Sequence, residues 1–428
     1  MNKKFLSNAS WIMVGRVIQL AMSFVTTMLV TRYLGPGTYG RLTYVFSYIQ
    51  LFLPVCALGM NDIIVKTLLD NKENSDEIMG TVIGMRLIVS IVCMICSVSL
   101  VALMNNDPSY RMIAILQSFS LAFYSFDSII YFFQANLLSK NVGIVLSLSY
   151  TLVSLFRITG IVLKKDLVWF GFGMSLDYII QAVLLMIAYF RNGRKLVFNK
   201  AYIKELLKRS SHYMIAGLLV VIYGKVTDIL LLGKLVDETN VGYYGSAITL
   251  CNAWPFVLTA IIDTANPIII SLFDHNKPLF EKRIRQLYSA IFYISLLASL
   301  GILVVGNFVI SLLYGRDFLP AAMPLKIYSF STAFSYLGVA RVAWMQCNEK
   351  TRYETRIALF GAVVNVALNY ILIRSFGING AALAAVLTQF LTNFVFLFAM
   401  KDTRENAKLI LDAILLRGVL NREEDTNV

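Results

Sequence analysis

Charged side chains are scarce in this chain of 428 residues, where they make up 15% of the total. Ordinary soluble proteins carry about 25%. There are only two histidines, His212 and His275, and they lack the spacing of a zinc site. The sequence also lacks the GxxxxGK motif of P-loop proteins and the GxSxG motif of serine hydrolases. These absences exclude nucleotide hydrolysis through a P-loop and argue against an enzyme, and we expect neither a cofactor nor a metal site.

Apolar residues dominate instead and account for 58% of the chain. A helix needs about 20 predominantly apolar residues to cross a bilayer. The sequence therefore predicts an all-α, polytopic membrane protein with twelve spans. These cover residues 11–31, 42–65, 81–104, 112–134, 142–163, 168–190, 213–235, 243–271, 288–313, 325–347, 357–374 and 381–400.

Basic residues are unevenly divided between the loops on the two sides of these spans. The net charge of +13 would suggest a nucleic-acid partner in a soluble protein. Here the inward loops hold roughly three basic residues for each one in the outward loops, which is typical of cytoplasmic loops. We therefore expect both termini in the cytoplasm and no nucleic-acid partner.

The two halves of the chain look like copies of each other. Three pairs of stretches recur in the same order: TRYLGPGTYG (31–40) and GKLVDETNVG (233–242), SFSLAF (118–123) and SFSTAF (329–334), and the predicted turns WFGFG (169–173) and SFGING (375–380). Because each half has six spans, an even number, both copies have the same orientation.

This repeat predicts four parts. They are an N-terminal six-helix lobe (1–190), a basic cytoplasmic linker (191–212), a C-terminal six-helix lobe (213–400) and a cytoplasmic tail (401–428) with an interfacial helix.

Polar residues follow one face of several spans. Lys225 and Asp228 lie near the middle of the apolar stretch 215–236, three residues apart and so on the same helix face. A charge at the bilayer centre costs roughly 2.5–3.5 kcal/mol even on the lenient insertion scale. Buried ion pairs or snorkelling would explain single charges such as Arg157. Together the polar faces predict a wet or substrate-filled space lined by Arg16, Gln19, Tyr124, Asp127, Arg157, Lys225, Asp228, Asn252, Asp263 and Arg341.

Three stretches carry a resemblance to a known family: ASWIMVGRVIQL (9–20), RYLGPGTYGRL (32–42) and FGINGAALA (376–384). With twelve spans in two parallel halves, they resemble the Wzx-type polysaccharide-unit flippases. These belong to the multidrug/oligosaccharidyl-lipid/polysaccharide exporter superfamily, together with the lipid II flippase and the MATE drug exporters. The resemblance covers residues 5–400, and its motifs are those of the fold rather than of the substrate.

The resemblance implies two lobes around a central cavity that opens alternately to each side. The cargo would be an undecaprenyl-pyrophosphate-linked oligosaccharide for O-antigen or capsule synthesis, moved to the outer leaflet of the bacterial cytoplasmic (inner) membrane. Basic residues of the first two helices in each lobe, here Arg16 and Lys225, would contact the pyrophosphate. Coupling to protons or sodium ions stays open, with Asp127, Asp228 and Asp263 as candidates, as does a partnership with polysaccharide polymerase machinery.

Two other functions stay open. A MATE-like, ion-coupled exporter of cationic drugs would use the acidic residues and would confer drug resistance on overexpression. A membrane-embedded polymerase or ligase would need a sizeable outer loop, and the outward loops here are all short.

Replacing Arg16 and Lys225 together with Ala is expected to abolish surface polysaccharide. The pyrophosphate would lose its charge-assisted hydrogen-bond donors inside the membrane. The measurement is the surface polysaccharide of cells whose only copy is the variant. Normal polysaccharide from the double variant at normal expression would refute this assignment.

Overall fold

The structure is a computed structural model that describes residues 3–419, with the backbone alone for residues 3–14, 16 and 62. Its contacts divide the chain into two compact units, unit 1 (Met1–Val221) and unit 2 (Ile222–Val428). All the regular elements among the described residues are helical, which confirms the predicted class. Helices satisfy their own backbone hydrogen bonds, as segments surrounded by lipid must.

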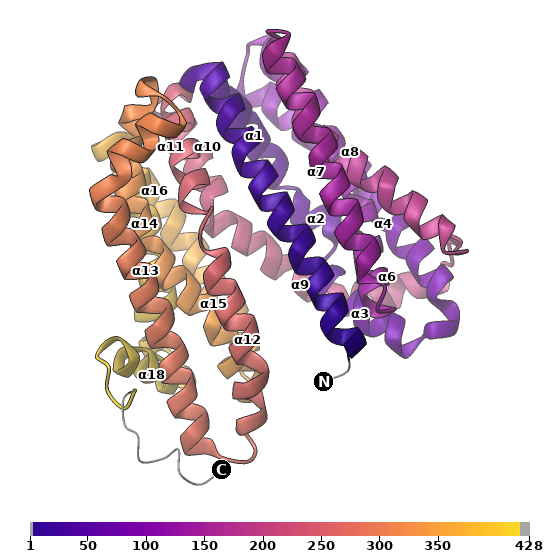
Figure 1. Cartoon of the computed structure of the whole chain (residues 1–428), viewed down its shortest axis with the longest axis vertical. Helices are drawn as coiled ribbons and strands as arrows, with labels where there is room; N and C mark the ends of the chain where they lie inside the picture. Colours follow the sequence, from indigo (N-terminus) through magenta and orange to yellow (C-terminus); the bar gives the residue numbers. More distant parts are fainter. Residues whose placement is uncertain (1–2, 420–428) are drawn as a thin grey trace. The chain divides into compact units, whose positions relative to one another are not determined.

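Unit 1 is built on long helices that pack side by side along their length. α1 packs along α7, and α5 packs against both α4 and α8, as Figure 1 shows for α1 and α7. The elements are α1 (Lys3–Gln50), α2 (Leu53–Ala57), α3 (Asn61–Asp70), η1 (Lys72–Asn74), α4 (Ser75–Met104), α5 (Pro108–Tyr124), η2 (Ser125–Asp127), α6 (Ser128–Ala135), α7 (Ser139–Val162), α8 (Leu167–Arg191) and most of α9 (Ala201–Tyr223).

Unit 2 has a comparable set of helices. α16 packs against α10 and α14, while α13 packs against α15 and α18. The elements are α10 (Lys225–Leu235), α11 (Glu238–Cys251), α12 (Phe256–Leu272), α13 (Lys277–Leu313), η3 (Arg316–Ala321), α14 (Ala322–Ser329), α15 (Ser331–Cys347), α16 (Arg352–Phe390), the π-helical η4 (Leu391–Val395), α17 (Phe396–Ala399) and α18 (Arg404–Ile414).

The helices identify a multi-pass membrane protein. Within the described part of the chain, seven helices are long and apolar enough to cross a membrane, or nine if two bent pairs each count as one span. The pairs are α9 with α10, bent by 45°, and α11 with α12, bent by 42°. Two of the seven, α1 and α16, contain a kink that divides each into two arms. The count of twelve spans therefore stays a prediction.

Glycines divide the two double-length helices. Gly35 has φ 73° and Gly377 has φ 55°, in the left-handed region that residues with a Cβ rarely adopt. Both glycines lie in stretches, 31–40 and 375–380, where the repeat predicts a connection between two spans. WFGFG (169–173) differs, because it lies inside α8. The turn comes earlier: Lys165 N donates to Gly160 O and Lys164 takes a positive φ, as in a Schellman motif that ends a helix.

The basic linker is fastened to unit 1. Lys195 N and the Tyr189 hydroxyl donate to the carboxylate of Asp76 at 3.3 and 3.2 Å. The Asn199 amide donates to Glu77 at 2.6 Å. These contacts tie the segment after α8 to the first turn of α4.

α9 begins within the predicted linker and continues without a break to Tyr223. Its residue Leu206 is buried in the hydrophobic core of unit 1. The two units consequently separate inside α9 and not at the linker. The predicted lobe boundaries stay a prediction, and the chain changes direction at Gly224, between α9 and α10.

The tail helix is docked on protein. Ala407, Ile410 and Ala413 of α18 are fully buried in the core of unit 2. The Asn406 amide donates to the hydroxyl of Tyr288 on α13 at 2.7 Å, and Figure 1 shows α18 beside α13. The apolar side expected to lie on the lipid surface is therefore covered by unit 2.

Replacing Gly80 with Ala is expected to destabilise the protein. The added Cβ would come within 2.3–2.6 Å of the backbone of Val197 in the linker. Overpacking of this kind costs about 1–3 kcal/mol. Gly301→Ala is the matched control, because a Cβ at that helical position meets nothing within 4 Å. Thermal unfolding in detergent measures both, and equal melting temperatures would contradict the close linker contact.

Candidate functional site

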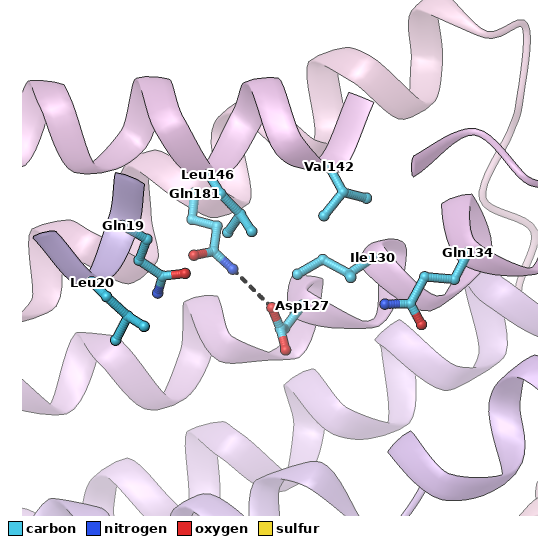
Figure 2. Close-up of a pocket in the computed structure, with 8 residues that line it drawn as sticks. All are labelled: Gln19, Leu20, Asp127, Ile130, Gln134, Val142, Leu146 and Gln181. Carbon is cyan, nitrogen blue, oxygen red and sulfur yellow. Dashed lines mark hydrogen bonds between the residues drawn. The ribbon is translucent and has the colours of Figure 1, made fainter. Parts of the chain in front are cut away.

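A polar pocket of about 380 Å³ opens within unit 1. Figure 2 shows the residues that line it: Gln19, Leu20, Asp127, Ile130, Gln134, Val142, Leu146 and Gln181. They come from α1, η2, α6, α7 and α8. Four are polar and four are aliphatic, which is the usual mixed lining of a small-molecule site.

The pocket brings together residues that are far apart in sequence. Gln19 and Asp127 are both predicted site residues, and both line the pocket although four α-helices, α2 to α5, and the turn η1 lie between α1 and η2 in the sequence. The Gln181 amide donates to Asp127 Oδ1 at 2.8 Å. Asp127 is the last residue of the short 3₁₀ turn η2, between α5 and α6, and its side chain lines the pocket.

Tyr124, a predicted site residue, contacts a buried arginine of unit 1. Its carbonyl accepts from Arg86 Nη2 at 3.1 Å, and the Arg86 guanidinium lies 5.0 Å from the centre of its ring. Arg86 is fully buried and also donates to Ser128 at 2.6 Å and to Asn61 at 3.1 Å. Tyr124 thus helps to hold a buried guanidinium, one turn away from the pocket.

Arg157 forms an ion pair within unit 1. Its Nη2 donates to Asp177 Oδ2 at 2.7 Å and to the carbonyl of Gly173 at 3.3 Å. Both side chains are largely buried, with 12% and 20% exposed. This is the ion-pair alternative considered from the sequence, since each charge compensates the other away from water.

Asp228 is the best-enclosed carboxylate of unit 2, with 2% of its surface exposed. Its Oδ2 accepts from the Tyr244 hydroxyl at 2.8 Å. Its Oδ1 accepts from the amides of Asn365 at 3.0 Å and Asn369 at 2.7 Å. The donors come from α11 and α16, so three helices meet at this group.

The local fold explains why a carboxylate is tolerated there. Asp228 lies in the first turn of α10, where the partial positive charge of a helix N-terminus favours an anion. α10 starts at Lys225 because the residue before it, Gly224, has an extended and not a helical backbone conformation. The amide oxygens of Asn365 and Asn369 are buried and have no hydrogen-bond partner among the described residues. The site therefore holds acceptor oxygens beyond those of the carboxylate.

Three other predicted residues of unit 2 lie on its surface. Lys225, Asn252 and Asp263 are all exposed. Lys225 and Asp228 both lie in α10, three residues apart, but Lys225 is exposed and Asp228 is buried. Polar groups at membrane depth need water, protein or a polar ligand around them.

Arg341 is engaged within unit 2. It is 3% exposed and forms a bidentate pair with Glu354, at 3.1 Å from Nε and 2.7 Å from Nη2. Its Nη1 donates to Asn393 in the π-helical turn η4 at 3.2 Å. A π-helical turn often marks a functional site, but here the guanidinium is satisfied by protein groups.

The sequence pointed to Asp127 and Asp228 as site residues, but not to the residues that donate hydrogen bonds to them. Gln181 lies on an apolar span and carries no signal of its own. Asn365 and Asn369 are four residues apart on α16, so their shared helix face could have pointed to a polar neighbour. The predicted site residue Arg16 is outside the side chains that the structure describes.

Comparison with known proteins gives both a family and a fold. The model of the family described as "Polysaccharide biosynthesis protein" matches residues 5–273. A relative from Haloferax volcanii, the probable low-salt glycan biosynthesis flippase Agl15, is 26% identical over 165 residues, which are 38% of this chain and 34% of that protein.

Two solved structures share the fold over almost the whole chain. The lipid II flippase MurJ in an inward closed conformation has a TM-score of 0.76 at 14% identity, covering 97% of this chain and 93% of its own. An inward-facing multidrug resistance transporter of the MATE family has a TM-score of 0.72 at 14% identity, covering 94% and 99%. The predicted fold, related to MATE exporters and the lipid II flippase, is thereby confirmed.

Replacing Asp228 with Leu is expected to lower the stability of unit 2. The substitution removes the acceptor of three buried hydrogen bonds, and a buried polar group left without a partner costs about 1–3 kcal/mol. Asp263→Leu is the matched control, because that carboxylate is exposed. Thermal unfolding in detergent should show a lower melting temperature for Asp228→Leu only. Similar melting temperatures for both variants would mean that the three hydrogen bonds do not support the fold.

Proposed function

The chain belongs to the family of polysaccharide biosynthesis proteins, and we propose that it is a flippase for lipid-linked glycans. The family match over residues 5–273 carries this proposal. It is supported by the probable flippase among its relatives and by a fold shared with a lipid II flippase. Such a protein moves its cargo without chemically changing it.

The cargo that we propose is an undecaprenyl-pyrophosphate-linked oligosaccharide repeat unit. Its polar head group could not cross lipid unaided, so it needs polar groups at membrane depth. The pocket in unit 1 and the exposed Lys225 and Asp263 of unit 2 supply such groups. The prenyl tail would stay in the bilayer while the two units alternate in access. The transfer would run outward across the bacterial inner membrane, with both termini in the cytoplasm.

Two energy sources fit this proposal. An inside-negative potential favours outward movement of an anion by about 2.3 kcal/mol per charge per 100 mV. Coupling to protons or sodium ions is the other source, and Asp228 is its best candidate. Beside this carboxylate lie two buried amide oxygens with no protein partner among the described residues, which suits a small cation or a proton carried by water.

A MATE-like exporter of cationic drugs is the second candidate. The likeness to a multidrug transporter and the carboxylate of Asp127 in the unit 1 pocket favour it. That function would need Asp127 to pair with a drug cation.

Deleting the gene is expected to abolish surface polysaccharide and to leave lipid-linked glycan on the cytoplasmic side of the membrane. Extraction of lipids from intact cells and from inverted vesicles, followed by glycan analysis, measures both. Overexpression should leave the sensitivity to cationic drugs unchanged. Resistance to such drugs, with normal polysaccharide in the deletion strain, would support the exporter instead.

A further inference from the structure

The linker between α8 and α9 and the first turns of α9 form a strongly basic surface of unit 1. From Arg191 to Arg209 the chain has seven basic residues and a single acidic one, Glu205. Clusters of about four to eight basic residues on an amphipathic helix or beside a membrane span are typical of sites for anionic lipids. The linker is therefore a candidate site for an anionic ligand.

Three of these basic residues, Lys200, Lys204 and Lys208, are exposed and follow one another at intervals of four residues. Lys204 and Lys208 are one turn apart on α9 and so lie on one face of it. None of the three lysines forms an ion pair with a residue that the structure describes, whereas Arg209 is paired with Glu205 at 2.9 Å. The lysines therefore present positive charge that the fold does not neutralise.

The opposite face of α9 is fixed to unit 1. Leu206 and Ser210, which are also four residues apart, are buried. A Cβ on Gly59, in the turn between α2 and α3, would come within 2.4 Å of the Ser210 carbonyl oxygen, so the two backbones are in contact. The lysine face is consequently held in one orientation, away from the core of unit 1.

The linker also lies against a membrane-spanning helix. An added Cβ on Gly84 of α4 would come within 2.8 Å of the Phe198 ring. With 30 residues α4 is about 45 Å long, and the hydrocarbon core of a bilayer is about 30 Å thick. The end that extends beyond this core is the one with Asp76 and Glu77 in its first turn, since charges avoid hydrocarbon. The linker therefore lies at the level of the lipid head groups.

Apolar side chains are exposed among the lysines. Phe198 is 46% exposed, and Leu207, three residues after Lys204 and so on the same side of α9, is 39% exposed. At a membrane surface such residues enter the boundary between head groups and acyl chains, while lysine side chains extend toward the phosphates. A soluble acidic protein or a nucleic acid would account for the charge but not for apolar groups beside a span. The combination favours a lipid bilayer.

We propose that this surface binds the head groups of anionic phospholipids in the surrounding bilayer. It consists of Lys200, Lys204, Lys208, Phe198 and Leu207. The ammonium groups bind the lipid phosphate, and the two apolar side chains contact the acyl chains. Because the other face of α9 is fixed to unit 1, lipids bound here hold the start of the helix that connects the two units. The site is independent of the cargo and so goes beyond the proposed function.

Native mass spectrometry of the full chain in detergent tests the site directly. The protein is titrated with phosphatidylglycerol or with phosphatidylcholine of the same acyl chains, and the Kd of the first bound lipid is measured. We expect phosphatidylglycerol to bind about tenfold more tightly, or better. The variant Lys200→Gln/Lys204→Gln/Lys208→Gln should lose most of this difference, because each lysine near anionic lipid contributes a gain in affinity of about fivefold.

Arg111→Gln/Lys164→Gln/Lys165→Gln is the matched control, because it removes the same charge from exposed residues elsewhere in unit 1. It should keep the preference of the unchanged protein. Equal affinity of the unchanged protein for the two lipids would leave the lysines to a soluble acidic partner and overturn the proposal. Full preference in the lysine variant, or the same loss in the control, would overturn it as well. A single peak in size-exclusion chromatography shows that each variant is folded.

Soluble sn-glycerol 3-phosphate separates a lipid site from a site for free phosphate. It carries the phosphate but lacks acyl chains to contact Phe198 and Leu207, so an excess should not displace phosphatidylglycerol. Displacement would assign the lysines to soluble anions and overturn the proposal. None of these measurements involves glycan transfer. A failure here therefore leaves the proposed flippase function untouched, and a failure of that function leaves the lipid site standing.

Discussion

A carboxylate can stay inside a membrane protein only if the protein replaces the water that it has lost, and Tyr244, Asn365 and Asn369 do this for Asp228. The same requirement explains the pair of Arg157 with Asp177 in unit 1. In both cases the partners come from the same unit. Each unit therefore holds these charges by itself.

The pocket of unit 1 gathers polar groups from helices that are far apart in the sequence. The Gln181 amide of α8 donates to Asp127 Oδ1 of η2, and Gln19 of α1 and Gln134 of α6 line the same space (Figure 2). Polar groups at membrane depth need water, protein or a polar ligand around them.

The connection between the two units is part of helix α9 and not a loop. The linker is held by Asp76 and Glu77, and α9 is rooted in the core of unit 1 through Leu206. After α9, the chain changes direction at Gly224, about one helical turn before Asp228. The bend of 45° between α9 and α10 therefore lies close to the buried carboxylate of Asp228.

The sequence by itself determined the helical class and the membrane location, while the repeat of six-helix halves stays a prediction. The length of apolar stretches, the charge of loops and helical spacing are local properties of a chain. The turns at Gly35 and Gly377 could be predicted because left-handed backbone conformations favour glycine. The tertiary structure alone decided what each charge faces. Lys225 and Asp228 were expected to share one polar face; both lie in α10, but the first is exposed and the second is enclosed by side chains of α11 and α16. Gln181 and Asn365 became partners of acids only through packing between helices distant in sequence, because hydrogen bonding depends on distances in space that residue spacing does not encode.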